Sequence, residues 1–211
     1  MCCYVERGTV RLFAAVDLEA RARAATSTGA ASLATRLDRL DPPAVIRWVV
    51  PEQLHFTLRF LGEVSETRCG LVRSAFAVPF ETSAFSATLT GADIFPFSGA
   101  PRVIWRGMGE GQDQLVALRA ELDRRLASVG FEPDTKLFRA HLTIGRVGRR
   151  SRASGAALRD VLGEDRSEAT RWAVDRVNLY ESRLGVGGAT YHLVESVVLP
   201  ASLGPREPPP V

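Results

Sequence analysis

Two segments of this chain carry nearly the same string of residues: HFTLRFLG at residues 55–62 and HLTIGRVG at residues 141–148. Each string starts with a histidine, an apolar residue, a threonine and an aliphatic residue, and ends on a glycine seven positions after the histidine. Apolar, β-branched and aromatic residues dominate both strings, which predicts strands over residues 54–61 and 136–147. Because residues two apart on a strand point to the same face, we expect each histidine to project beside its threonine.

The strings lie in two parts of the chain that repeat the same order of elements. The order strand, helix, strand over residues 10–61 recurs over residues 102–147, which indicates an internal duplication with two lobes facing each other. Strands and helices mix without strict alternation, and this favours an α+β fold with largely antiparallel sheets. The expected strands are 10–17, 46–50, 54–61, 85–95, 102–108, 136–147, 172–181 and 190–199, and the expected helices are 19–40, 65–78, 112–129 and 156–162. Ser65 is the expected N-cap of the second helix.

The composition is that of an ordinary globular protein of 211 residues, with 45% hydrophobic and 24% charged residues. A net charge of +3 is too small for a bulk DNA binder, but it suits a small anionic substrate. No apolar run reaches the about 18 residues that a membrane span requires, and the first residues lack a cationic start followed by an apolar stretch, so we expect no secretory signal. The 3 cysteines show no metal-ligand spacing, so we expect a reducing, cytoplasmic location without a metal site.

The chain contains no linker long enough to separate independent domains, so we expect one bilobal domain over residues 10–200. Residues 1–9 show no periodicity and are expected to be a flexible N-terminal extension. Residues 201–211 end in GPREPPPV, a proline-rich tail that we expect to be disordered. We expect a monomer.

A pair of imidazoles is suited to acid–base chemistry at a phosphodiester. Imidazole titrates near pH 6.5, so at working pH one ring can act as a neutral base and the other as a protonated acid. The base activates water and the acid protonates the leaving oxygen, without a metal ion or other cofactor. Threonine hydroxyls can donate to the non-bridging phosphate oxygens, and an arginine can neutralise the charge that develops on them.

The chain resembles the 2H phosphoesterase superfamily, named for two His-x-Thr/Ser-x motifs, and within it the RNA 2′,3′-cyclic phosphodiesterases, also called 2′-5′ RNA ligase-like proteins. The resemblance runs from about residue 10 to residue 199. It rests on VRLFAAVDL at residues 10–18, IRWVVPEQLHFTLRFLGEV at 46–64, PRVIW at 101–105, FRAHLTIGRV at 138–147 and VNLYESRL at 177–184. It implies two α+β lobes related by a pseudo-twofold axis, with the two motifs facing each other across a central groove.

The resemblance also implies a role for each site residue. His55 is the general acid, placed against the leaving O3′, and His141 is the general base that activates water. Thr57 and Thr143 hold the phosphate, and Arg146 pairs with it. The chain departs from the family at Ala140, where a proline often precedes the second histidine.

The expected activity is hydrolysis of RNA or oligonucleotide 2′,3′-cyclic phosphate ends to 2′-phosphates. One alternative is the reverse chemistry, 2′-5′ ligation of RNA. Another is a nucleotide- or RNA-binding module without turnover, although the intact His55, Thr57, His141 and Thr143 argue against it.

Several assignments stay open at the level of the residues. Strict alternation places Arg146 on the face opposite His141, so either the strand ends or bulges there, or Arg59 is the phosphate partner. His192 lacks a threonine two residues on, which favours a structural role. The basic residues after the second motif are either RNA contacts or a solvated loop; they are Arg149, Arg150 and Arg152.

Overall fold

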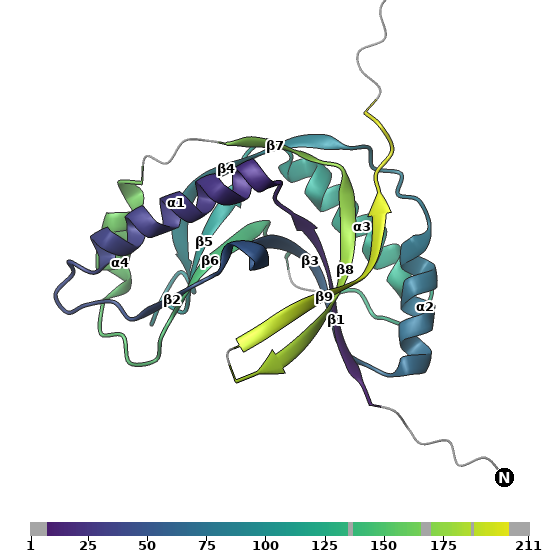
Figure 1. The fold of residues 1–211 in the computed structure, drawn as a ribbon, viewed down its shortest axis with the longest axis horizontal. Helices are drawn as coiled ribbons and strands as arrows, with labels where there is room; N and C mark the ends of the chain where they lie inside the picture. The colour runs from purple at the N-terminus through teal and green to yellow at the C-terminus, as the bar shows by residue number, and fades with distance from the viewer. Residues whose placement is uncertain (1–7, 135–136, 166–169, 187, 203–211) are drawn as a thin grey trace, which may run out of the picture.

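The computed structural model describes residues 8–134, 137–165, 170–186 and 188–202 (Figure 1). Within these residues one antiparallel sheet of 9 strands has the order β7-β4-β5-β6-β3-β1-β8-β9, and β2 pairs with β6 off this path. The strands are β1 (Val10–Asp17), β2 (Ile46–Trp48), β3 (His55–Val64), β4 (Phe85–Phe95), β5 (Val103–Met108), β6 (His141–Val147), β7 (Arg171–Val174), β8 (Arg176–Gly185) and β9 (Gly188–Val198). The helices are α1 (Ala20–Leu37), α2 (Glu66–Ala77), α3 (Gln112–Ala127) and α4 (Gly155–Gly163), with a short 3-10 turn, η1 (Pro51–Gln53).

The sheet consists of two lobes that meet where β3 pairs with β6, at Phe56 opposite Leu142. One lobe has the order β3-β1-β8-β9 and the other the order β6-β5-β4-β7. The two parts of the chain exchange a strand, because β4 follows α2 but pairs with β5, whereas β8 comes late in the chain but pairs with β1. The α+β class, the antiparallel pairing and the two related lobes are therefore confirmed.

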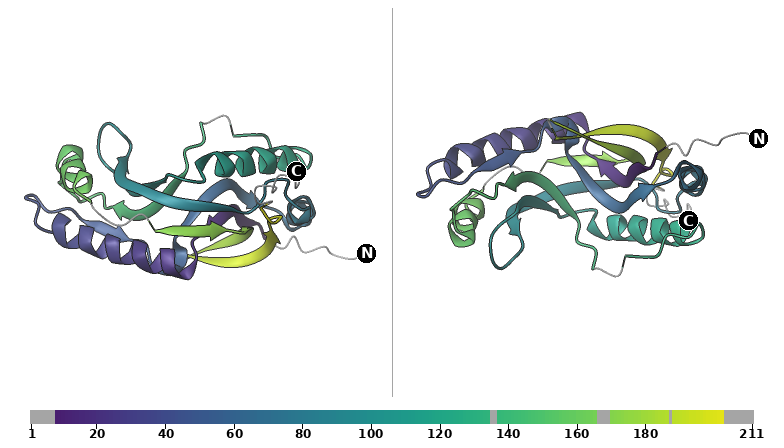
Figure 2. Two further views of the ribbon diagram at one scale, coloured as in Figure 1. Left: turned by 90° about the horizontal axis from the view of Figure 1, so that it is seen from above. Right: turned by 90° about the horizontal axis from the view of Figure 1, so that it is seen from below.

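The long helices are exchanged in the same way. Helix α1 contacts α4 and β7 of the second lobe, and α3 contacts β3 and α2 of the first. Figure 1 accordingly shows α1 with α4 at one end of the molecule and α2 with α3 at the other. Figure 2 places α1 and α3 on opposite sides of the strands. This arrangement leaves the motif strands β3 and β6 in the middle, between the lobes.

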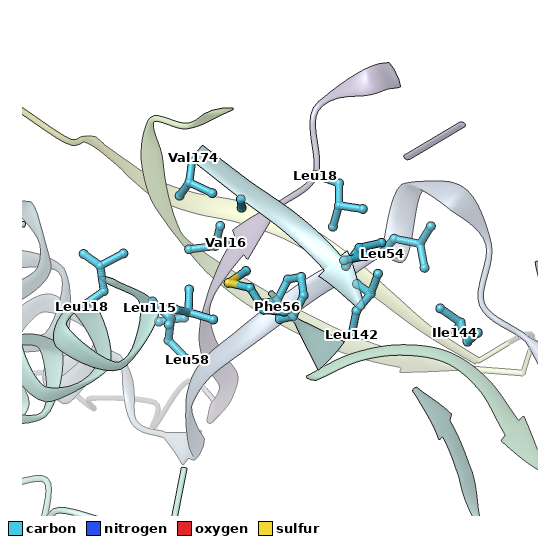
Figure 3. Close-up of a cluster of buried hydrophobic side chains, with 14 of the residues drawn as sticks. Val16, Leu18, Leu54, Phe56, Leu58, Leu115, Leu118, Leu142, Ile144 and Val174 are labelled. Atoms are coloured by element: carbon cyan, nitrogen blue, oxygen red, sulfur yellow. The ribbon is translucent and has the colours of Figure 1, made fainter. Parts of the chain in front are cut away.

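The motif strands are anchored by the apolar residues that alternate with the histidines and threonines. Phe56 and Leu142 are 0% exposed, and Leu58 and Ile144 are 1% exposed. Figure 3 shows these four side chains in one cluster, with Leu115 of α3 beside Leu58. Burial of a side chain of this size contributes about 1.5–3 kcal/mol, so the core fixes the position of both strands.

Strand β3 continues three residues beyond the expected end at residue 61. Gly62 has a φ of +74°, in the left-handed region, and the pairing with β1 shifts by one residue between Phe60 and Gly62. The glycine therefore accommodates a β-bulge instead of ending the strand.

The strands expected over residues 136–147 and 172–181 were wrong in extent. Strand β6 begins only at His141, because β5 pairs with it no further than Gly107. The second expected strand is two strands, since β7 pairs with β4 and β8 pairs with β1. The buried apolar positions are 172 and 174 before Asp175 but 177 and 179 after it, so the apolar alternation changes phase at that residue.

The other elements agree with the sequence to within three residues. Helix α1 ends at residue 37, and a turn extends to Leu40 through a bond from its N–H to the carbonyl of Leu37. Ser65 caps α2, its hydroxyl accepting from the N–H of Arg68 at 3.5 Å. Residues 1–7 of the expected N-terminal extension and residues 203–211 of the expected tail lie outside the described residues.

Candidate active site

The two motif histidines have the same local geometry. Nδ1 of His55 lies 2.8 Å from the carbonyl oxygen of Gln53, and Nδ1 of His141 lies 2.8 Å from that of Arg139. A carbonyl oxygen only accepts, so Nδ1 carries the hydrogen in each ring. The tautomer of each neutral imidazole is thereby set, and Nε2 is the nitrogen that can exchange a proton with a substrate.

The two motif threonines line the same cavity as the histidines. Thr57 Oγ1 lies 3.1 Å from Nε2 of His55. Both strands bulge directly after the threonine, because the pairing of β3 with β1 shifts at Leu58 and the pairing of β6 with β5 shifts at Ile144. Each bulge changes the face on which the following residues lie.

The bulge on β6 brings Arg146 to the cavity face. The position fifth after the first histidine is Phe60, and it lines the cavity as Arg146 does. Strict alternation placed Arg146 on the strand face opposite His141, and the bulge removes this conflict. The two strings present unlike residues at this matching position, an exposed phenylalanine and an exposed arginine.

These residues surround a cavity of about 620 Å³ at the junction of the lobes. Its charged lining is mostly basic, with Asp134 the acidic member within the described part of the chain. Its polar and charged lining is Arg47, Gln53, His55, Thr57, Arg119, Asp134, Arg139, His141, Thr143, Arg146 and Tyr191. The volume is in the range of small-molecule sites, about 300–1,000 Å³.

The family model described as the 2′-5′ RNA ligase superfamily matches residues 22–185. The chain belongs to the 2′-5′ RNA ligase superfamily. Among its relatives, a protein of Methanothermobacter thermautotrophicus is 34% identical over 188 residues, which cover 86% of this chain and 95% of the relative. A protein of Archaeoglobus fulgidus is 36% identical over 143 residues, covering 67% of this chain and 75% of the relative. Both relatives carry the name RNA 2′,3′-cyclic phosphodiesterase.

Two solved structures share the fold of this chain. The crystal structure of E. coli LigT complexed with 3′-AMP matches with a TM-score of 0.69 and 26% identity, covering 90% of this chain and 98% of that one. The crystal structure of the protein TT0787 of Thermus thermophilus matches with a TM-score of 0.68 and 25% identity, covering 91% of this chain and 99% of that one.

The surroundings of His55 disfavour its charged form in this superfamily member. Burial lowers the pKa of His55, and the positive charges of Arg146 and His141 lower it further. The carbonyl of Gln53 and the carboxylate of Asp17 act in the opposite direction.

Aromatic rings support both histidines. The ring of Phe13 lies 5.0 Å from that of His55, and Tyr191 meets His55 edge-on at 5.3 Å. Phe95 meets His141 edge-on at 5.3 Å. These contacts hold the imidazoles in place and exclude water from their sides.

The alternative site residues lie elsewhere. Arg59 is 11% exposed and is engaged by Asp123 at 3.6 Å, Asp134 at 3.9 Å and the carbonyl of Glu132. His192 is exposed on β9, with Thr190 Oγ1 3.4 Å from its Nε2. The basic residues after the second motif are exposed and lie outside the cavity lining; they are Arg149, Arg150 and Arg152.

Several residues of the site were missed by the sequence reasoning. Gln53 and Arg139 stand two positions before the histidines, but both precede the strands, so strand alternation does not place them. Tyr191 could have been found as the neighbour of His192 on the opposite face of its strand. Arg47 faces Arg146 across the pairing of β2 with β6, a register that no local pattern reveals.

The described residues contain neither a candidate metal site nor a candidate membrane-spanning helix. Within them, no group of three or more His, Cys, Asp or Glu side chains is arranged to hold a metal ion. None of the described helices combines the length and apolar character needed to cross a membrane.

Proposed function

We propose that this protein is an RNA 2′,3′-cyclic phosphodiesterase that hydrolyses cyclic phosphate ends to 2′-phosphomonoesters without a metal ion. The names of its relatives support this activity. The observation that carries it is the pair of histidines in one cavity, each with Nδ1 on a backbone carbonyl, so that Nε2 is the nitrogen that can exchange a proton with the substrate.

In the proposed reaction, Nε2 of His141 takes a proton from water as the water oxygen bonds to phosphorus. The bond from phosphorus to O3′ breaks on the opposite side, and His55 gives the proton on its Nε2 to O3′. The products are a 3′-hydroxyl and a 2′-phosphomonoester. Thr57, Thr143 and Arg146 stabilise the charge on the non-bridging oxygens, which is largest in the transition state.

The substrate class we propose is the end of an RNA or oligonucleotide chain. Arg47 and Arg139 add positive charge to a cavity in which Arg146 already faces the motif histidines. A cyclic phosphodiester carries one negative charge, so this basic lining suits a ligand with further phosphates.

The test is to incubate the protein, with and without EDTA, with an oligoribonucleotide that ends in a 2′,3′-cyclic phosphate. We expect hydrolysis that EDTA leaves unchanged and that follows a bell-shaped pH profile, because one ring must be neutral and the other charged. Loss of activity in EDTA and recovery with a divalent ion would contradict the metal-free mechanism. Joining of two RNA ends would support 2′-5′ ligation, which the family description favours as the second function, and binding without turnover would exclude both.

A further inference from the structure

The two half-sites differ in the residue that faces each histidine across the sheet. On the β1 side, Asp17 stands opposite His55 in the strand pairing. On the β5 side, the residue opposite His141 is Gly107. The pseudo-twofold relation of the motif strands therefore ends at this position, where one histidine has a carboxylate neighbour and the other has none in the matching place.

The carboxylate of Asp17 is held by two donors from β8. The hydroxyl of Tyr180 donates to Asp17 Oδ2 at 2.5 Å, and Nδ2 of Asn178 donates to the same oxygen at 2.8 Å. Burial and the neighbouring carboxylate raise the pKa of Tyr180 well above its usual value, so this hydroxyl remains a donor. Asn178 is 4% exposed. This network holds the carboxylate in place on the strand that pairs with His55.

Burial and the neighbouring positive charges oppose a proton on the His55 ring, whereas the carbonyl of Gln53 favours one. Arg146 and His141 face it from β6 with positive charge, and Tyr191 of β9 contributes an aromatic edge. Asp17 is the group of negative charge that acts on His55 among the described residues. We propose that Asp17 is a positioning residue that stabilises the proton on His55 against burial and these positive charges, and thereby supports the role of His55 as the acid of the pair.

This inference rests on the proposed function and leads to a distinctive pH dependence. The reactive form has a proton on His55 and none on His141. When the pH is well above the pKa values of both histidines, the fraction of this form depends on the pKa of His55 alone. When the pH is well below both pKa values, the fraction depends on the pKa of His141 alone. A change that lowers the pKa of His55 therefore reduces kcat/KM on the alkaline limb and leaves the acid limb unchanged.

The experiment uses Asp17→Asn, which keeps the size of the side chain and an oxygen that can accept from Tyr180. We expect the ring signals of His55 in an NMR titration of the protein to shift to a lower pKa. On the alkaline limb we expect kcat/KM to fall by about tenfold for each pKa unit of that shift, with the acid limb of the wild-type profile retained. The matched control is Asp93→Asn on β4, whose carboxylate forms an ion pair of 3.3 Å with Arg159 of α4, and it should change neither readout.

Tyr180→Phe provides a test of opposite sign. It removes one donor from the Asp17 carboxylate while keeping the ring that stacks on Phe13 at 5.4 Å. The carboxylate then acts more strongly on His55, so the pKa of His55 and the alkaline-limb kcat/KM should both rise.

Three results would overturn the proposal. The first is that Asp17→Asn leaves the pKa of His55 unchanged. The second is that this variant loses activity equally at every pH. The third is that its kcat/KM rises on the acid limb, which would make His55 the base. Absence of turnover by the wild-type protein, with the His55 shift still present, would instead contradict the proposed function.

Discussion

At the scale of single residues, the site depends on short hydrogen bonds that the chain makes with itself. Each motif histidine donates from Nδ1 to a carbonyl only two residues earlier, so a local contact orients the ring. The acceptors, at Gln53 and Arg139, lie two residues before the motifs, so each half-site is built from one short segment of the chain. It also means that replacement of either ring removes the reactive nitrogen without disturbing the core on the other strand face.

We predict that His55→Ala and His141→Ala each reduce kcat by about 10²–10⁴-fold, the usual contribution of a positioned acid or base. The double variant should be scarcely slower than either single variant, because both residues act on one transition state. Steady-state kinetics on a cyclic-phosphate-ended oligomer measures both effects. His192→Ala is the control and should retain the wild-type rate. If turnover required His192 but not His55, the assignment of the catalytic histidines would be wrong.

The two arginines that competed for the phosphate-binding role make a matched pair of variants. Arg146→Gln should reduce kcat by about 10²–10³-fold, as loss of a charge-stabilising donor does, with little change in the free energy of unfolding. Arg59→Gln should leave kcat close to wild type and lower the free energy of unfolding by about 1–3 kcal/mol, because its partners lose a buried donor. Activity assays and urea titrations of both variants measure these effects. If Arg59→Gln lowered kcat and Arg146→Gln lowered only the free energy of unfolding, Arg59 would be the phosphate ligand.

Sequence reasoning at this scale reached the residues whose signal is local. The four motif residues are found by their strings, and the structure brings them to one cavity, while their catalytic roles stay predictions. Arg47 and Asp17 could not be found in this way, because each owes its position to the register between strands that are distant in the chain.

At the scale of elements, the shape of the site comes from two bulges on a rigid support. Both motif strands gain one residue after the threonine, at Leu58 and at Ile144, and this rotates the fifth residue after the histidine into the cavity. The sequence raised a bulge on β6 as one solution to the parity of Arg146, but alternation alone could not decide it. Bulges depend on the pairing partner, which is a tertiary property.

We predict that Phe56→Ala lowers the free energy of unfolding by about 3–5 kcal/mol, since it removes a fully buried ring from the β3–β6 junction. Phe56 stacks on Trp172 of β7, so the cavity left behind would reach both lobes. Chemical denaturation followed by tryptophan fluorescence measures the change. Phe97→Ala, at an exposed ring on the segment after β4, should cost far less; equal costs would mean that Phe56 does not anchor the junction.

At the scale of the whole molecule, the exchange of strands and helices makes the two lobes a single unit. β4 and α1 belong by pairing or contact to the second lobe, and β8 and α3 to the first, so neither part of the chain can complete its lobe alone. The recurrence of strand, helix, strand predicted two lobes correctly. It could not predict the exchange, because the pattern of one strand is the same whichever sheet edge receives it.

The departures from twofold symmetry in this unit predict a single product. A five-membered cyclic phosphate has two possible leaving oxygens, O2′ and O3′, and water enters opposite the one that leaves. Two identical half-sites would accept the ring in either orientation and yield both phosphate isomers. Here Phe60 in the half-site of His55 matches Arg146 in the half-site of His141. Asp17 pairs with His55, whereas Gly107 pairs with His141. At these matching positions, the His141 half-site carries the cation and the His55 half-site carries the carboxylate.

This asymmetry requires one binding orientation, and the resemblance to RNA 2′,3′-cyclic phosphodiesterases places His55 against O3′. We therefore expect a product with a 2′-phosphate and a free 3′-hydroxyl. Phosphorus NMR of the product formed from a short 2′,3′-cyclic-phosphate-ended oligomer distinguishes the isomers, with the mixture from alkaline hydrolysis as the reference. A 3′-phosphate would reverse the placement of His55 and His141 about the ring. An even mixture would mean that the residues breaking the symmetry do not orient the substrate, because each half-site would then deliver its proton to either oxygen.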